Sequence, residues 1–190
     1  MRGRNIYHHM HYEDCGAFQF YEIGLNNLVI ENTMARGGGF LAWGQWRRNA
    51  GAVNINLMNQ YIGNEITEGA RAEHRSTVPL ADKPWGDALQ NSGAGFAVVD
   101  NGNTSANIPI REVDRLIVFR RNKIWSNGGF LVGPATDVLV ENSEVANTPS
   151  GSFAQAKTNF QVSSLALGVL LVNNTDAGRR SNATAGLPLE

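Results

Sequence analysis

Residues 28–44 read Leu-Val-Ile-Glu-Asn-Thr-Met-Ala-Arg-Gly-Gly-Gly-Phe-Leu-Ala-Trp-Gly. This is a short apolar run, one asparagine, a second short run, a glycine turn and a third run that opens on phenylalanine. Residues 119–133 repeat the same order, and the equivalent positions are Asn32 and Asn122, Gly38-Gly39 and Gly128-Gly129, and Phe40 and Phe130. A repeated order of this kind indicates that one structural unit is used more than once in the chain.

Two residue types mark this repeat along the whole sequence. The asparagine recurs at Asn32, Asn64, Asn122, Asn142 and Asn174, with spacings of 32 (64−32), 58 (122−64), 20 (142−122) and 32 (174−142). Phenylalanine follows small residues at Phe18, Phe40, Phe96, Phe130 and Phe153. A shortest spacing near 20, with longer intervals that contain insertions, is typical of a coil whose turns accept loops of different lengths.

The runs between these markers have the chemistry of strands. Each is about four to six residues long, with β-branched or aromatic residues at alternate positions, and is too short for a helix. Asparagine tolerates the left-handed backbone conformation and can bend a strand at one residue. The repeat resembles the right-handed parallel β-helix of pectate-lyase-like proteins, in which three strands per coil stack into three sheets. It carries no catalytic signature of that group.

The resemblance implies an all-β fold, a single-stranded right-handed parallel β-helix of about seven coils. A leucine-rich repeat is one alternative, but the chain lacks its regular Leu-x-x-Leu-x-Leu spacing. A β-sandwich is another, and only Asn101-Gly102 and Asn127-Gly128 would supply its hairpin turns.

One domain is expected over residues 1–176, with an inserted loop at 70–95 and a polar tail at 177–190. The first coil begins without a capping segment. Because an open stack exposes strand edges, we expect either a fragment that lacks N-terminal coils or a homo-oligomer that covers its ends.

Composition excludes several classes of function. The net charge is −1 and 17% of residues are charged, so no global field favours nucleic acid or an anionic membrane. The single Cys15 excludes an intrachain disulfide. No apolar run approaches the roughly 20 residues of a membrane span, and the N-terminus has no apolar signal segment. The resemblance alone implies an extracellular or periplasmic location.

Strand alternation predicts which side chains of the phenylalanine strand face outward. Because Phe40 should point inward, the outward set is Gln19, Tyr21, Leu41, Trp43, Ala97, Val99, Leu131 and Gly133. This stripe is more apolar than a solvated face should be. Tyr21, Trp43 and Trp46 on a rigid sheet would be platforms for sugar rings. The alternative is that the loop at 70–94 folds over the stripe and buries it.

Charged residues near this stripe suggest a polysaccharide as substrate. A lyase needs a base, an acid and a group that neutralises the uronate carboxylate, and we assign these catalytic roles to Arg47, His74 and Arg75. We expect Glu22, Arg48 and Asp100 to contact substrate. Calcium is implied by the resemblance only. The predicted function is binding or processing of a polysaccharide, lyase-like or glycosidase-like, and whether the chain is an enzyme stays open. The alternative is a non-catalytic structural or adhesive module that oligomerises through the apolar stripe.

The first coil carries a histidine cluster. If it is a strand, His9, His11 and Glu13 share one face and are a plausible metal-ligand set. The alternative is a frayed first coil with exposed histidines, and we assign no metal ligand. Arg120, Arg121 and Lys123 are expected to be a solvated basic patch.

Overall fold

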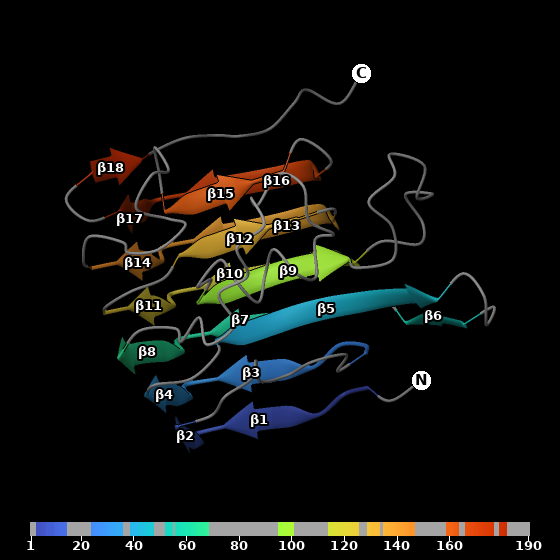
Figure 1. Cartoon of the computed structure of the whole chain (residues 1–190), viewed down its shortest axis with the longest axis horizontal. Helices are drawn as coiled ribbons and strands as arrows, with labels where there is room; N and C mark the ends of the chain where they lie inside the picture. The colour runs from blue at the N-terminus through green and yellow to red at the C-terminus, as the bar shows by residue number, and fades with distance from the viewer. Residues whose placement is uncertain are drawn as a thin grey trace, which may run out of the picture.

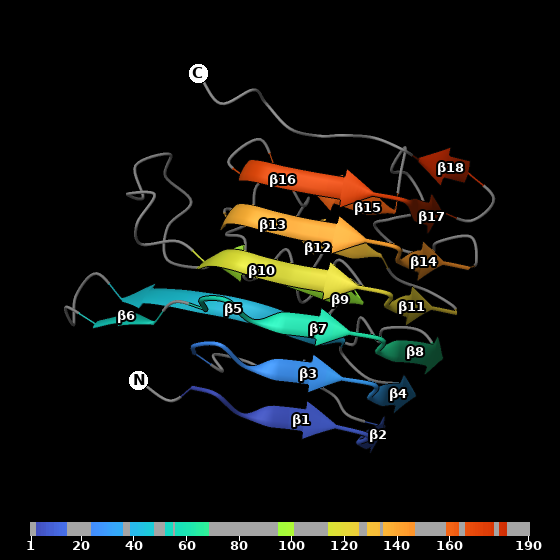
Figure 2. The same ribbon diagram turned by 180° about the vertical axis from the view of Figure 1, so that it is seen from behind.

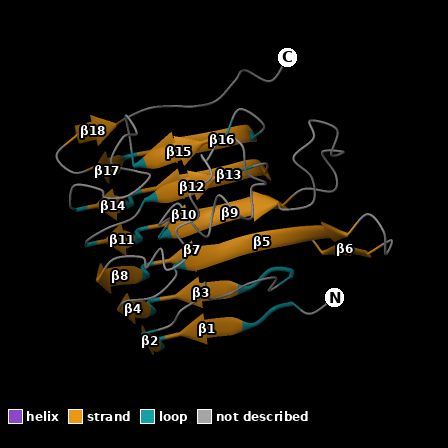
Figure 3. Ribbon diagram, viewed as in Figure 1, coloured by secondary structure: helices purple, strands orange, loops and turns teal. Residues whose placement is uncertain are grey.

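The computed structural model describes residues 3–14, 24–35, 39–47, 52–54, 56–68, 95–100, 114–125, 129–133, 135–146, 159–163, 166–176 and 179–181. All regular elements in these ranges are β-strands, which form three sheets (Figures 1 and 3). Within them, no helix is long and apolar enough to cross a membrane. The expected all-β class is therefore confirmed for the described part of the chain.

Each sheet is built from strands that recur along the sequence. The first sheet has the order β1 (Ile6–His8), β3 (Leu28–Ile30), β7 (Gln60–Ile62), β10 (Asp114–Arg120), β13 (Ala135–Glu141) and β16 (Leu167–Val172). The second has the order β2 (His11–Glu13), β4 (Thr33–Ala35), β8 (Glu65–Glu68), β11 (Lys123–Ile124), β14 (Glu144–Val145), β17 (Asn174–Asp176) and β18 (Arg179–Ser181). The third has the order β6 (Ala52–Asn54), β5 (Phe40–Arg47), β9 (Phe96–Asp100), β12 (Phe130–Val132) and β15 (Phe160–Val162).

The chain visits the three sheets in a fixed order. Strands β10, β11 and β12 lie in the first, second and third sheets, and β13, β14 and β15 repeat this order one level along the stack (Figures 1 and 2). Neighbours pair in parallel, except that β6 pairs antiparallel with β5 and β18 with β17. This arrangement is consistent with a parallel β-helix. It does not fit a β-sandwich, whose sheets are antiparallel.

Left-handed residues make the corners between the first and second sheets. The equivalent positions in successive levels have φ between 50° and 65°, and they are His9, Glu31, Gly63, Arg121, Asn142 and Asn173. A second set lies two residues before β1, β3 and β7 and within the first three residues of β10, β13 and β16, and its members are Arg4, Asn26, Met58, Leu116, Asp137 and Gly168. A single left-handed residue reverses the local curvature and bends the strand without a loop. The bends therefore need only one residue each.

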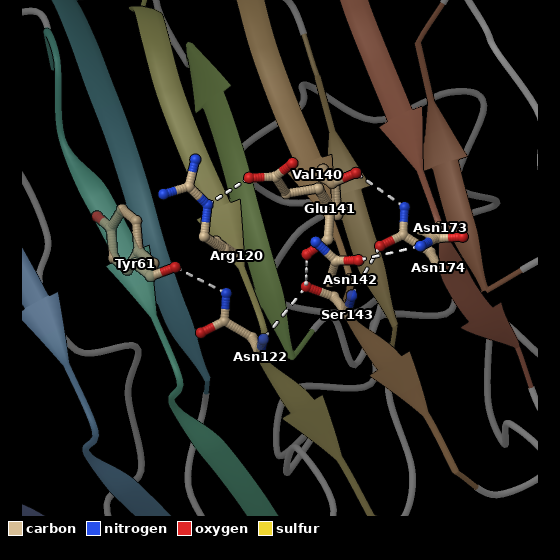
Figure 4. Close-up of polar contacts among 9 residues, drawn as sticks. All are labelled: Tyr61, Arg120, Asn122, Val140, Glu141, Asn142, Ser143, Asn173 and Asn174. Atoms are coloured by element: carbon tan, nitrogen blue, oxygen red, sulfur yellow. Dashed lines mark hydrogen bonds and ion pairs between the residues drawn. The ribbon is translucent and has the colours of Figure 1, made fainter.

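The residue after each corner belongs to a stack of hydrogen-bonded side chains, which we call the corner ladder: Asn32, Asn64, Asn122, Ser143 and Asn174. The backbone N–H of Asn32 donates to Asn64 Oδ1 at 3.0 Å, and the N–H of Asn64 donates to Asn122 Oδ1 at 2.9 Å. Figure 4 shows the upper part, where Ser143 replaces asparagine and its N–H donates to Asn174 Oδ1 at 2.9 Å. The ladder satisfies backbone groups that the bend removes from the sheets.

One predicted marker in this ladder is wrong by one residue. Asn142 is exposed, has φ 50° and occupies the left-handed corner position, whereas Ser143 is buried in the ladder. The sequence Asn-Ser offers two polar residues that both favour bends. The pairing of Glu144 with Lys123 on the neighbouring strand decides between them.

The interior is filled by rows of stacked side chains. Phe40, Phe96, Phe130 and Phe160 stack across the third sheet, with ring centroids 5.3, 4.9 and 4.9 Å apart. All four are buried, so the inward direction predicted for Phe40 is confirmed. The predicted marker Phe153 is wrong, because Phe160 opens β15 and pairs with Phe130. Phe18 lies outside the described residues.

Tyr61 provides a test of this core. Its side chain is fully buried and stacks on Phe119 at 5.0 Å, and its hydroxyl has no hydrogen-bond partner. An unpaired buried hydroxyl costs about 1–3 kcal/mol. We expect Tyr61→Phe to raise the free energy of unfolding at pH 7 by about 1 kcal/mol, measured by urea denaturation.

The same substitution should change the pH dependence of stability. Burial raises the pKa of the Tyr61 phenol well above its usual range, and the Asp114 carboxylate raises it further. The folded state keeps the proton above pH 10, where the unfolded chain releases it, so native stability falls by about 1.4 kcal/mol per pH unit there. Tyr61→Phe should remove this slope. Tyr12→Phe is the control, because the Tyr12 hydroxyl donates to Met10 Sδ at 3.1 Å and its loss should not stabilise the protein. An unchanged alkaline slope in Tyr61→Phe would contradict the prediction.

Candidate functional site

Four of the predicted site residues lie on two neighbouring strands of the third sheet. Trp43, Trp46 and Arg47 belong to β5, and Asp100 is the last residue of β9. The two strands pair in parallel, with Trp43 opposite Val99 and Gly44 opposite Asp100. The backbone therefore brings the Trp43 and Asp100 positions to the same end of adjacent strands. The other predicted site residues, Tyr21, Glu22, Arg48, His74 and Arg75, lie outside the described residues.

Strand β5 continues beyond the point where β9 ends. Its last residues pair antiparallel with β6, so that Gln45 lies opposite Asn54, Trp46 opposite Val53 and Arg47 opposite Ala52. Figure 1 shows this two-stranded extension at one end of the third sheet. Trp46 and Arg47 are thus held on regular strand backbone, which positions side chains more reproducibly than a loop does.

The predicted apolar stripe is not exposed along its whole length. Leu131 is 4% exposed and Gly133 is also buried. On β15 the equivalent of Leu131 is Gln161, which is partly buried. The expectation of a solvent-exposed apolar stripe is therefore wrong at β12. Covering of the stripe was the alternative considered from the sequence, but the loop at 70–94 lies outside the described residues.

A cluster of aromatic and charged side chains lies on the second sheet, where the sequence did not suggest a site. Trp125 is 41% exposed, and its Nε1–H donates to Glu65 Oε2 at 3.1 Å. Lys123 Nζ lies 3.6 Å from the centroid of the indole ring and 2.9 Å from Glu144 Oε2. The sequence feature that could have predicted this cluster is Trp125, which follows directly after the short strand that contains the outward residue Lys123. Because the ammonium group covers one face of the indole, the cluster presents less stacking surface than a bare tryptophan.

The predicted basic patch is divided by a corner. Arg120 lies on the first sheet and pairs with Glu141 (Figure 4). Arg121 is the left-handed corner residue, and Lys123 lies on the second sheet. The cations at 120 and 123 are each paired with an acidic residue on the neighbouring strand. No unpaired basic surface results from these two residues.

The histidines of the first level are also separated by a corner. His9 has φ 54° and turns the chain between β1 and β2, so strand alternation does not relate it to His11. His9 Nε2 lies 2.9 Å from Glu31 Oε2, and His11 Nδ1 lies 2.8 Å from Thr33 Oγ1. The suggestion that His9 shares a face with His11 and Glu13 is therefore wrong. His11 and Glu13 do lie on one face of β2, with His11 Nε2 3.8 Å from Glu13 Oε2. Among the described residues, no three His, Cys, Asp or Glu side chains are grouped to hold a metal ion.

No protein-family model, curated protein or solved structure matches this chain. A functional assignment therefore rests on the arrangement of its own residues, since a fold of this kind supports unrelated activities.

Proposed function

We propose that this chain is a right-handed parallel β-helix of about seven coils that binds or processes a polysaccharide along the outer face of its third sheet. The observation that supports this proposal is the register of β5 and β9, with Trp43 opposite Val99. Because strand residues alternate and Phe40 is buried, Trp43 is assigned to the outer face. Asp100, two residues after the buried Val98, has the opposite parity and would reach the polymer around the end of β9. Strands spaced by about 4.8 Å form a long, regular surface, as an extended polymer requires.

In this proposal the aromatic residues hold sugar rings and the charged residues hold polar groups. Tyr21, Trp43 and Trp46 offer flat apolar rings to the C–H faces of sugars. Glu22, Arg48 and Asp100 would contact hydroxyl or carboxylate groups. If the chain is catalytic, Arg47, His74 and Arg75 are the residues that would neutralise a uronate carboxylate and move the proton.

Binding to a panel of acidic and neutral polysaccharides, with and without calcium, tests this proposal. We expect one polymer to bind, and Trp43→Ala to weaken its affinity at least about tenfold, because a central aromatic contact carries much of the binding energy. Trp125→Ala is the matched control, since Trp125 is an exposed tryptophan on the second sheet. The affinity of Trp125→Ala for the polymer should stay within about twofold of the affinity of the native protein.

Three results would contradict the proposal: no polymer binds, Trp43→Ala binds like the native protein, or only Trp125→Ala loses binding. Turnover is measured separately by the absorbance of unsaturated uronate products. If His74→Ala binds the polymer but no longer turns it over, the chain is a lyase. If the native protein binds the polymer without turnover, the chain is a non-catalytic module.

The second candidate is a structural or adhesive module that associates through an apolar surface. The buried Leu131 disfavours the third sheet as that surface. The exposed apolar residues of the first sheet favour a different location.

A further inference from the structure

The exposed apolar side chains of the described residues are concentrated on one face. Six of the large hydrophobic residues that are exposed lie on the first sheet or at its leading corner, and they are Ile6, Met58, Leu116, Leu167, Leu170 and Val172. Leu170 is 47% exposed and Ile6 is 64% exposed. These six residues are distributed from β1 to β16 across this sheet, and exposed apolar side chains that gather on one face of a folded chain point to an interaction site. Figure 2 shows the six strands of this sheet side by side, with this outer face toward the viewer.

The register of the strands arranges this face in two rows. The first row contains Gln60, Val118, Leu139 and Leu170, and the second contains Ile62, Arg120, Glu141 and Val172. The residues between the rows are buried: Tyr61, Phe119, Val140 and Leu171. Both rows therefore point out of the molecule, and the only charged side chains in them are Arg120 and Glu141.

Arg120 and Glu141 have opposite charges and lie at the same register position of adjacent strands, where they form an ion pair. A two-fold axis that runs along the strands, midway between β10 and β13, would exchange their positions. Arg120 of one copy would then face Glu141 of the other, and each cation would have two carboxylates within reach. The same operation opposes Val118 with Leu139, Ile62 with Val172, and Gln60 with Leu170. The surface is therefore complementary to itself in charge, and apolar at both pairs except that Gln60 meets Leu170 at the edge of the contact.

We propose that this face of the first sheet is the contact surface between two copies of the chain, which pack sheet on sheet with β10 and β13 at the centre. Twisted sheets that pack in this way keep their strands within about 30° of each other. The partner is a second copy of the chain, because the two-fold operation brings Arg120 opposite Glu141 and Val118 opposite Leu139. This surface lies on a different sheet from the proposed polysaccharide site, so both can be occupied together.

The size of the contact predicts its strength. Four strands spaced by about 4.8 Å, with about five residues of 3.3 Å each, cover roughly 300–400 Å² of each copy in projection. The two copies together contribute roughly 600–800 Å², which is below the roughly 1,200 Å² of total surface that stable complexes bury. The dimer should therefore be weak and reversible, with a Kd between about 10 µM and 1 mM.

Sedimentation velocity across about 10–500 µM full-length protein tests this proposal. We expect the sedimentation coefficient of the native chain to rise with concentration. Leu139→Lys should weaken the dimer at least about tenfold, because it puts an ammonium group at the centre of an apolar contact. Trp125→Lys, at an exposed aromatic residue of the second sheet, should dimerise like the native protein. Circular dichroism establishes that each variant is folded.

A charge exchange tests the orientation of the two copies. Arg120→Glu alone should abolish measurable dimerisation, because it faces four carboxylates toward one another across the interface. The double variant Arg120→Glu/Glu141→Arg should recover at least about half of the native association, since both the internal and the intermolecular pairs are restored. A sedimentation coefficient that is independent of concentration, equal effects of Leu139→Lys and Trp125→Lys, or no recovery in the double variant would each overturn the proposal.

Discussion

Asn64→Ala is expected to lower the free energy of unfolding by about 4 kcal/mol, enough to unfold much of a marginally stable domain. The Asn64 side chain is fully buried and makes four hydrogen bonds. Its Nδ2 donates to Val29 O at 2.9 Å and to Asn122 Oδ1 at 3.1 Å. Its Oδ1 accepts from the backbone N–H of Asn32 at 3.0 Å and from Asn32 Nδ2 at 2.9 Å.

The cost is large because alanine removes every partner and leaves the neighbours buried. A polar group without a partner in the interior loses its hydration and gains nothing in return, which costs about 1–3 kcal/mol for each group. The groups that lose a partner are Val29 O and the backbone N–H and Nδ2 of Asn32, all on one neighbouring level, whereas Asn122 Oδ1 keeps the Asn64 backbone N–H. The loss should therefore also reduce cooperativity between these two levels. Urea denaturation followed by circular dichroism measures both the midpoint and the slope of the transition.

Asn142→Gly is the matched control for this experiment. Asn142 is exposed, and its side chain accepts a hydrogen bond only from Asn173 Nδ2, at 3.3 Å on the surface, among the contacts of described residues. Glycine retains the left-handed backbone at φ 50° without strain. We expect its free energy of unfolding to stay within about 0.5 kcal/mol of the native value. Equal losses in Asn64→Ala and Asn142→Gly would show that the corner ladder does not stabilise the fold.

Phe96→Ala is expected to cost about 3–5 kcal/mol of stability. Phe96 is fully buried between Phe40 and Phe130, at 5.3 and 4.9 Å between ring centroids, and Phe119 packs edge-on at 6.1 Å. Removing the ring leaves a cavity in the middle of the row, and close-packed neighbours on rigid strands can move only slightly into it. Thermal and urea denaturation measure the loss.

Two further variants test whether the loss of stability comes from the position of Phe96 in the row, or whether any substitution in the core has the same effect. Phe96→Leu keeps most of the apolar volume and should cost no more than about 1.5 kcal/mol. Phe160→Ala, at the end of the described row, should cost less than Phe96→Ala, because among the described residues Phe96 stacks on two rings and meets Phe119 edge-on, whereas Phe160 stacks on Phe130 in the row. If Phe160→Ala costs as much as Phe96→Ala, the position within the row is irrelevant and this account of the row is incorrect.

The reach of sequence-based prediction here has a physical cause. Trp43 and Trp46 were assigned to a strand from the local residue pattern, and both lie on β5. The Arg120–Glu141 pair and the Lys123–Glu144 pair were missed, because each joins residues that are neighbours only across strands. The apolar surface was assigned to the third sheet from one strand pattern. Among the residues whose burial is described, most of the exposed large hydrophobic side chains lie on the first sheet or at its leading corner, and separate short strands contribute them.

The sequence by itself determined the short strands and the inward direction of Phe40, because alternation depends on residues next to one another in the chain. It marked the level of each bend but not the bending residue, because the left-handed residues are Glu31, Gly63, Arg121 and Asn173, each directly before a ladder asparagine. Only the tertiary structure decided that Ser143 enters the ladder in place of Asn142, and that Phe160 joins the row in place of Phe153. The levels of the stack are joined by loops of very different length, and the entropy of closing a loop changes slowly with its length. Stacking between levels, and not the spacing along the chain, therefore selects which residues meet.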